Sequence, residues 1–359
     1  MRILIIQTAF LGDMIITLPL IDLLRAKGAA SELAVIAAPA GARLLETQGS
    51  VEEIIEFDKR EADSGPSGTL RIARAGRTFG ADVVLVPHRS FRSAAIAALI
   101  GAAKRIGFDE SGGRALLTET VRYRARGHEI ERVASLAEPL GVELPPGRIP
   151  FRVRVDETAE HGLDARLRDG GVEDRFAVLA PGSRWATKRW PEQRYAELAG
   201  RLTESGLGVV IVGGEDDREV SACVASLAGT KVLDTTGSLT LAQWLAVVRR
   251  SSVVISNDSA AAHVAAGVGT PVVAVFGPTA PEQGFAPYTD RSAIVAAELD
   301  CRPCGRHGAD DCARGTHQCM EDVTVSRVFK AVRGLLDDAG SPAGPDAAPG
   351  TEARPGGMV

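Results

Sequence analysis

The chain has 359 residues, of which 45% are hydrophobic and 24% charged, and its formal net charge is −5 at pH 7. This length predicts two or three domains, and the composition and charge exclude wholesale disorder and a general nucleic-acid-binding protein. No apolar run approaches the ~20 residues of a membrane-spanning helix, and the apolar start is too short for a secretion signal, so we expect a cytoplasmic protein.

The first part of the chain alternates short β-branched runs with longer segments rich in Ala, Leu and Arg. Strands are predicted at 2–6, 33–37, 54–57 and 82–86, and helices at 14–27, 68–77 and 90–100. This order predicts a parallel sheet covered by helices on both faces. A break in the pattern then predicts a domain boundary, at Pro145, Pro146, Gly147 and Pro150.

After the break the alternation restarts. Strands are predicted at 176–179, 208–212, 231–233, 253–255 and 271–276, and helices at 192–204, 217–228, 240–249 and 259–266. Two doubly wound α/β domains facing each other across a cleft account for this order most simply. A closed (β/α)8 barrel has the same unit but does not explain the break. Residues 339–359, rich in Pro, Gly and Ala, are predicted to be a flexible tail.

The loop after the first predicted strand carries no known nucleotide fingerprint. Residues 7–13 lack G-x-G-x-x-G, and the whole chain lacks G-x-x-x-x-G-K-[ST], which excludes P-loop nucleotide hydrolases. Gly12-Asp13 places a carboxylate at the start of a helix. A helix cap is the simplest interpretation of that pair alone. A ligand-facing acid is the alternative, because open α/β sheets bind ligands beyond the carboxyl ends of their strands.

Two loops of the second domain carry residues suited to a nucleotide. The loop 181–191 contains Ser183, Thr187 and Lys188, whose hydroxyls and ammonium can bind phosphate oxygens. An ordinary polar loop is the alternative. The loop 213–217 contains Glu215, which can accept hydrogen bonds from ribose hydroxyls, while the two aspartates after it are also suited to helix capping.

A third loop opens a helix of very small residues. Asp258 and Ser259 lie at its start, where free backbone amides bind anions. His263 follows about one turn later and can still face such a site. A histidine with a purely structural role is the alternative.

These loops, in this order, resemble those of the ADP-heptose:lipopolysaccharide heptosyltransferases of glycosyltransferase family 9, most closely the heptosyltransferase II type. The resemblance covers about residues 1–335. The matching segments are 12–14, 87–93, 181–191, 257–263, 269–279 and the C-terminal cysteine cluster.

The resemblance implies the GT-B architecture, with two Rossmann-like domains facing across a cleft. It implies an acceptor-binding domain at 1–155 and a nucleotide-sugar domain at 156–338, followed by the tail. The implied activity is inverting transfer of L-glycero-D-manno-heptose from ADP-heptose to the inner core of lipopolysaccharide, on an acceptor of the heptosyl-Kdo2-lipid A type.

The resemblance also assigns roles to residues. Asp13 matches the family's general base, and Glu215 matches the acid near the adenosine ribose. Ala260 departs from the family pattern, because relatives often have glycine there, and its methyl group lies where the backbone approaches the donor. The remaining matches are the phosphate loop, Ser183, Thr187 and Lys188, and the second donor loop, Asp258, Ser259 and His263.

Inverting transfer needs a base for the acceptor hydroxyl and a stabiliser for the departing diphosphate. The chain contains no D-x-D triplet, so we expect no metal cofactor in this reaction. Lys188, the helix N-terminus at Asp258 and His263 are the groups expected to neutralise the leaving group.

Residues 71–126 hold eleven Lys and Arg against four Asp and Glu, in a chain that is negative overall. A solvated face is one interpretation. The other is attraction to an anionic acceptor, with Arg89 and Arg92 as candidate contacts, and to the inner face of the cytoplasmic membrane, where the lipid acceptor lies.

Four of the five cysteines form the cluster Cys301-x2-Cys304-x7-Cys312-x6-Cys319. The first pair has zinc-ligand spacing, but the second is too widely spaced for a standard ribbon or knuckle. Reduced thiols that shape a loop, a structural metal and disulfides all stay open, and no metal is predicted.

Other functions are also consistent with these motifs. One is a family-9 enzyme with another nucleotide-sugar donor or another acceptor. A second is a non-catalytic protein that binds nucleotide sugars or lipopolysaccharide, which Asp13 beside an intact phosphate loop disfavours. A nicotinamide dehydrogenase is disfavoured by the missing glycine fingerprint.

Overall fold

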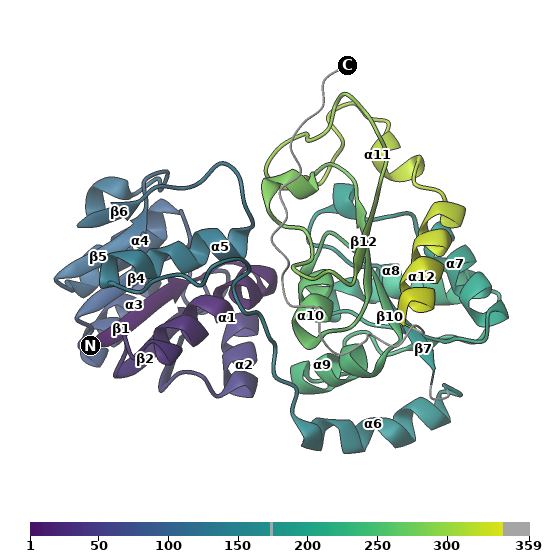
Figure 1. Cartoon of the computed structure of the whole chain (residues 1–359), viewed down its shortest axis with the longest axis horizontal. Coiled ribbons are helices and arrows are strands. Elements are labelled where there is room, and N and C mark those ends of the chain that lie inside the picture. The colour runs from purple at the N-terminus through teal and green to yellow at the C-terminus, as the bar shows by residue number, and fades with distance from the viewer. Residues whose placement is uncertain (173–174, 340–359) are drawn as a thin grey trace.

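The computed structural model describes residues 1–172 and 175–339, which form two α/β lobes side by side (Figure 1). Each lobe is built on a six-stranded sheet in which every paired strand is parallel to its neighbour. The predicted fold class is confirmed. The predicted tail lies, except for its first residue, outside the described residues.

The first sheet has the strand order β3-β2-β1-β4-β5-β6, which is the order of a doubly wound nucleotide-binding fold. Its strands are β1 (Arg2–Gln7), β2 (Glu32–Ala37), β3 (Glu53–Glu56), β4 (Val83–Val86), β5 (Lys104–Phe108) and β6 (Glu119–Val121). The α-helices of this lobe are α1 (Leu11–Ala26), α2 (Pro39–Gln48), α3 (Gly65–Phe79), α4 (Phe91–Ile100) and α5 (Glu129–Ala134).

The second sheet repeats this order, read from its other edge, as β12-β11-β10-β7-β8-β9. Its strands are β7 (Phe176–Ala180), β8 (Gly208–Ile211), β9 (Leu233–Asp234), β10 (Val253–Asn257), β11 (Val272–Phe276) and β12 (Ser292–Ala296). The helices that follow the first lobe are α6 (Glu157–Asp169), α7 (Glu192–Glu204), α8 (Arg218–Leu227), α9 (Leu241–Arg250), α10 (Ala260–Val268), α11 (Gln318–Glu321) and α12 (Val325–Ala339).

Strand β1 shows why its sequence is apolar throughout. Alternate side chains of a strand point to opposite faces of the sheet. Ile3 and Ile5 pack into the core that contains α1, whereas Leu4 and Ile6 pack into the core of α3 and α4 on the other face. A strand that is buried on both faces cannot alternate apolar and polar residues. The continuous apolar run in the sequence therefore predicted this strand correctly.

The inner helix layers of the two lobes merge into one apolar core. Ile15 of α1, Leu245 of α9 and Val264 of α10 belong to the same cluster of buried side chains, and α1 packs directly on α10. Apolar burial therefore holds the lobes together at the base of the space between their sheets.

Several elements have no counterpart in the sequence predictions, namely α2, α5, α6, α11, α12, β5, β6 and β12. Helix α6 illustrates the reason, because Leu163 and Leu167 are the apolar side chains that it buries, too few for a clear helical period. Among the described residues, none of the helices has the length and apolar content needed to cross a bilayer.

A second junction between the lobes lies at α5. The Arg132 guanidinium donates to the carbonyl oxygens of Arg124 at 2.7 Å in the first lobe and of Gln283 at 2.8 Å in the second. The Glu129 amide donates to the carbonyl of Gly284 at 2.9 Å. These bonds fix α5 against the segment that follows β11, and hence one lobe against the other.

Gly284 should be intolerant of a side chain. Its φ is +97°, and a Cβ there would lie 2.6 Å from the carbonyl oxygen of Gly127, which is backbone and cannot move aside. We expect Gly284→Ala to lower the free energy of unfolding by clearly more than the roughly 1–2 kcal/mol of left-handed backbone strain. Urea denaturation measures this loss.

Gly80→Ala is the matched control, because Gly80 has φ +68° and open space around its Cβ position. Equal losses in the two variants would show that the close packing around Gly284 adds no cost beyond the left-handed backbone conformation.

Candidate active site

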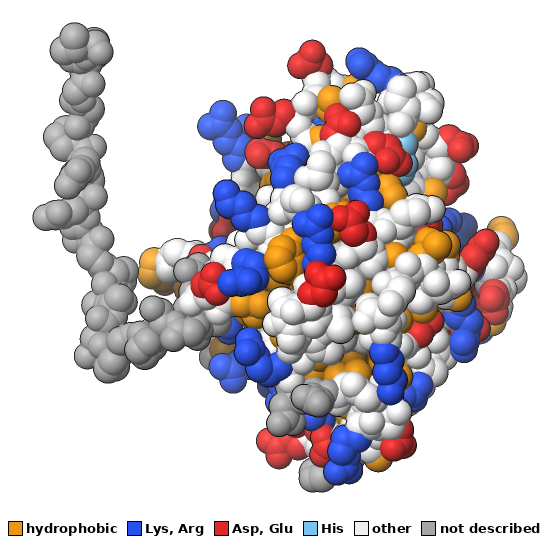
Figure 2. Space-filling model, turned by 90° about the vertical axis from the view of Figure 1, so that its right-hand side faces the viewer, with side chains coloured by type: hydrophobic (Ala, Val, Ile, Leu, Met, Phe, Trp, Pro, Cys, Tyr) orange, Lys and Arg blue, Asp and Glu red, His pale blue; other side chains and the backbone are white. Residues whose placement is uncertain are grey.

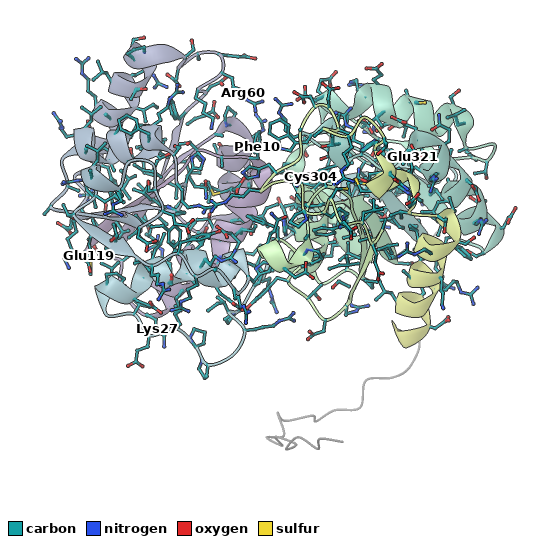
Figure 3. The ribbon with its side chains drawn as sticks, turned by 90° about the horizontal axis from the view of Figure 1, so that it is seen from above. Phe10, Lys27, Arg60, Glu119, Cys304 and Glu321 are labelled. Atoms are coloured by element: carbon teal, nitrogen blue, oxygen red, sulfur yellow. The ribbon has the colours of Figure 1, made fainter. Side chains whose placement is uncertain are left out.

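A cleft of about 1080 Å³ lies between the lobes and is lined by residues of both. In the first lobe the lining comes from the start of α1, from α2 and from Arg60. In the second it comes from the loops after β7, β8, β10 and β11, from the region between β9 and α9, and from the segment after β12. Seen from above, Phe10 and Arg60 lie on the side of the first lobe that faces the second (Figure 3). The carboxyl ends of both sheets therefore meet at one cavity, as expected for an open α/β fold.

Asp13 lies in the first turn of α1 and lines this cleft. Its carboxylate accepts a hydrogen bond from the Phe10 amide at 3.2 Å, so it caps the helix and faces the cleft at the same time. Burial raises its pKa to about 6; the charge of Glu129 adds to this rise, while the Phe10 bond and the charge of Lys188 oppose it. A carboxylate with such a pKa is ionised at neutral pH and is a much better base than an ordinary aspartate.

Asp13 and the second donor loop are brought together by a close approach of α1 to α10. A Cβ on Gly12 would lie 3.6 Å from Cδ2 of His263 and 3.7 Å from Cα of Ala260. His263 is buried, and burial lowers its pKa to about 4. The imidazole is neutral at pH 7, so it offers a hydrogen bond to a ligand and not the positive charge that the sequence analysis allowed for.

Lys188 and Asp258 form an ion pair in the cleft wall. The distance from Nζ to Oδ2 is 2.6 Å, and the two side chains are only 12% and 6% exposed. The hydroxyl of Thr279 donates to the same Oδ2 at 2.7 Å. Sequence reasoning gave Thr279 no role, although it follows β11 and so lies at the carboxyl edge of the sheet.

The other residues of the phosphate loop do different things. Ser183 is buried and lines the cleft. The Thr187 hydroxyl donates to the carbonyl of Ala309 and accepts from its amide, both at 2.8 Å. It therefore fastens the loop after β12 and is not directed at the cleft, because hydroxyl orientation cannot be read from the order of residues in a loop.

Glu215 and Ser259 both line the cleft, on opposite sides of the β7 loop. Glu215 is exposed and paired with Arg218, while the carboxylate of Asp217 caps the amide of Gly214 at 2.9 Å. Ser259 lies at the start of α10, and its hydroxyl is 2.9 Å from that of Ser256. Asp217 therefore acts as the cap, whereas a ribose contact of Glu215 stays a prediction.

One end of the cleft was not predicted. Leu239, Leu241 and Trp244 line it from the second lobe, and Ile16 and Arg43 line it from the first. These side chains come from α1, α2 and the region around the start of α9. Because no single loop of the sequence contains them, the sequence does not predict that they lie together. They form a largely apolar end, which suits a flat ring such as a base.

The two candidate acceptor arginines lie outside the cleft lining. Arg89 pairs with Glu110 at 3.1 Å and lies over the ring of Tyr123. Glu110 also pairs with Arg306 of the second lobe at 2.9 Å, so Arg89 belongs to a contact between the lobes. Arg92 is exposed and does not line the cleft. The cations of the first lobe that do face the cleft are Arg43 and Arg60.

The cysteines of the cluster are free thiols in this structure. Burial raises the pKa of Cys319 to about 11, whereas backbone amides from residues 314–317 hold the pKa of Cys312 below its usual value. Within residues 1–172 and 175–339, no three Cys, His, Asp or Glu side chains are grouped closely enough to hold a metal ion. The segment that carries them packs on the phosphate loop, where His317 Nε2 lies 2.7 Å from the carbonyl of Thr187.

Comparison with known proteins places this geometry in a family. Residues 69–310 match the model of glycosyltransferase family 9 (heptosyltransferase). The chain is 29% identical to lipopolysaccharide heptosyltransferase 2 of Salmonella typhimurium, over 95% of this chain and 100% of that protein. It is 28% identical to lipopolysaccharide heptosyltransferase 2 of Escherichia coli K12, over 94% of this chain and 99% of that protein.

Solved structures show the same fold. A family 9 glycosyl transferase from Veillonella parvula superposes with a TM-score of 0.81 at 24% identity, covering 94% of this chain and 97% of the other. The ADP-heptose LPS heptosyltransferase II of Escherichia coli superposes with a TM-score of 0.76 at 24% identity, covering 95% and 100%. With its two facing Rossmann-like lobes and a cleft lined by residues of four of the family motifs, this chain belongs to glycosyltransferase family 9, the heptosyltransferase family.

Proposed function

We propose that this protein transfers L-glycero-D-manno-heptose, with inversion, from ADP-heptose to the inner core of lipopolysaccharide. The observation that carries the proposal is the placement of Asp13 on one lobe opposite Lys188 and Asp258 on the other, in one cleft. A base and an anion-binding group that face each other are what inverting transfer requires.

In the proposed reaction the donor lies against the second lobe and the acceptor against the first. Asp13 removes the proton of the attacking hydroxyl as the hydroxyl oxygen bonds to the anomeric carbon of the heptose. The bond from that carbon to the β-phosphate oxygen breaks, and ADP leaves with the electron pair. Lys188 and the amides at the start of α10 stabilise the negative charge of the leaving diphosphate.

The apolar end of the cleft supports adenosine as the nucleoside. Leu239, Leu241 and Trp244 offer a surface for a base, and Glu215 lines the same cleft, where its carboxylate can accept hydrogen bonds from ribose hydroxyls. The reaction as proposed needs no metal, because the diphosphate charge is met by Lys188 and helix amides. The alternative is a family-9 enzyme whose donor carries uracil or guanine in place of adenine.

The donor assignment predicts selective turnover. With an acceptor of the heptosyl-Kdo2-lipid A type, the protein should consume ADP-heptose and leave UDP- and GDP-sugars unchanged. Mass spectrometry of the acceptor measures the added heptose. Faster transfer from a UDP- or GDP-sugar would replace the proposed donor, and nucleotide-sugar binding without any transfer would favour a non-catalytic role.

The base assignment predicts a large loss in Asp13→Asn. The amide keeps the shape of the side chain but cannot accept the proton, so the turnover rate should fall by about 10²–10⁴. ADP binding should survive, because the donor loops lie on the other lobe. Asp22→Asn is the matched control, since Asp22 lies on the same helix but outside the cleft lining.

The pH profile of the parent provides the second readout of this assignment. Asp13 must be ionised to act, and its pKa is about 6, so kcat/KM should fall as the pH falls through 6. Turnover of Asp13→Asn within a few-fold of the parent, or a profile that stays flat well below pH 6, would reduce Asp13 to a helix cap.

We also propose that the first lobe contacts the inner face of the cytoplasmic membrane. Phe91 is 64% exposed beside exposed Arg92, and the eleven cations of residues 71–126 are on this lobe. The outer face of the second lobe, by contrast, carries both signs of charge interspersed (Figure 2). A lipid-linked, phosphorylated acceptor would be met by the cationic lobe.

This contact predicts binding to vesicles that contain anionic phospholipid, with loss of binding at high salt. A cation near a membrane surface contributes about 1 kcal/mol, so Arg92→Glu should weaken sedimentation with vesicles roughly tenfold or more. Lys330→Glu on α12 of the second lobe changes the charge equally and should bind as the parent does. Equal loss in both variants would mean that net charge, and not this lobe, governs binding.

A further inference from the structure

One oxygen atom in the cleft wall, Oδ2 of Asp258, accepts hydrogen bonds from two sides. The Lys188 ammonium lies at 2.6 Å and the Thr279 hydroxyl at 2.7 Å. Asp258 is buried, Thr279 is 3% exposed, and all three residues line the cleft. Three elements therefore converge on this atom: the phosphate loop after β7, the start of α10 and the loop after β11.

A buried ion pair of this kind needs help to hold one geometry. The ammonium of lysine is a point charge on a flexible stem, so its position is set by whatever it pairs with. The carboxylate of Asp258 can turn about its last torsion unless a second bond fixes it. The Thr279 hydroxyl supplies that bond on the very oxygen that holds Lys188.

The backbone of Thr279 is itself held from behind. The guanidinium of Arg302 donates to the carbonyl of Thr279 at 2.9 Å and also to that of Gly277. The Cys304 amide donates to the carbonyl of Pro278 at 2.8 Å. The hydroxyl of Thr279 is thus presented by a loop whose main chain is anchored at three successive residues.

We propose that Thr279 is a positioning residue for the donor diphosphate, acting through Asp258 on Lys188. Its hydroxyl bond fixes the carboxylate and takes up part of that oxygen's hydrogen-bonding capacity. The ammonium is then aimed at the phosphate loop and keeps N–H groups free for phosphate oxygens. Without the hydroxyl, Asp258 is free to turn, and Lys188 follows it or is held by it more strongly, so the diphosphate loses a charge-assisted contact in either case. This inference rests on the proposed donor site and adds a residue to it.

Thr279→Val tests the proposal, because valine has the same shape without the hydroxyl. We expect about tenfold weaker ADP binding by calorimetry, in the range set by one hydrogen bond to a charged group. The KM for the nucleotide-sugar donor should rise and kcat should fall, while the KM for the acceptor stays unchanged. Thr279→Ser keeps the hydroxyl and should restore ADP binding. Lys188→Ala, which removes the cation itself, sets the largest loss that this route can produce.

Two comparisons separate positioning from simple loss of packing. Adenosine lacks the phosphates, so parent and Thr279→Val should bind it equally. Thr270→Val is the matched structural control, because Thr270 is also 3% exposed and its hydroxyl donates to a carbonyl, that of Val248, at 2.9 Å, outside the cleft lining. It should lower the melting temperature without changing ADP binding.

Unchanged ADP affinity in Thr279→Val would overturn the proposal, as would equal weakening of ADP and adenosine. The outcome is separable from the proposed function. A parent that binds ADP through Thr279 but transfers no heptose would refute the reaction and leave the positioning role. Heptose transfer by Thr279→Val at the rate of the parent would refute the positioning role and leave the reaction.

Discussion

The close approach of two helix N-termini, those of α1 and α10, is the constraint on which the rest of the site depends. A Cβ on Gly12 would lie at ordinary van der Waals distance from His263 and Ala260 of the opposite lobe, which shows how near the two helix starts are to each other. The small residues of α10 leave the room that α1 occupies. Apolar packing between these helices fixes the floor of the cleft, and the carboxyl edges of both sheets then have to face each other above it.

This constraint also explains the electrostatics of the cleft. Bringing two helix starts together places Asp13 within reach of the charge of Lys188, which forms an ion pair with Asp258, in a cleft lined by both lobes. Burial raises the pKa of Asp13 and lowers that of His263, so the first becomes a usable base and the second stays neutral. Among the cations that line the cleft, Lys188 is committed to Asp258, and whatever fixes Asp258 also decides how Lys188 meets a phosphate.

Much of the fold and part of the site could be predicted from the sequence, for identifiable reasons. Strands buried on both faces leave apolar runs such as Ile3–Ile6, and the polar residues that follow such runs lie at the carboxyl edge of the sheet. Asp13, Lys188 and Asp258 follow such runs, and all three line the cleft. The direction in which a side chain points cannot be predicted from such a pattern in the sequence. Thr187 was expected to face the phosphates and instead bonds Ala309, and Arg89 was expected to meet the acceptor and instead pairs with Glu110. Trp244 and Arg43 could not be found because only the packing of separate elements brings them to the cleft.

The segment after β12 that carries the cysteine cluster contacts the loops of the cleft wall. Ala309 and His317 bind Thr187, Arg302 and Cys304 bind the loop that presents Thr279, and Arg306 pairs with Glu110 on the opposite lobe. One segment after β12 thus supports both walls of the anion site and touches the first lobe as well. Thr187 precedes Lys188 in the chain and Thr279 binds Asp258, so the loops that carry both partners of the ion pair are in contact with this one segment. The four cysteines of the cluster lie in this segment as free thiols.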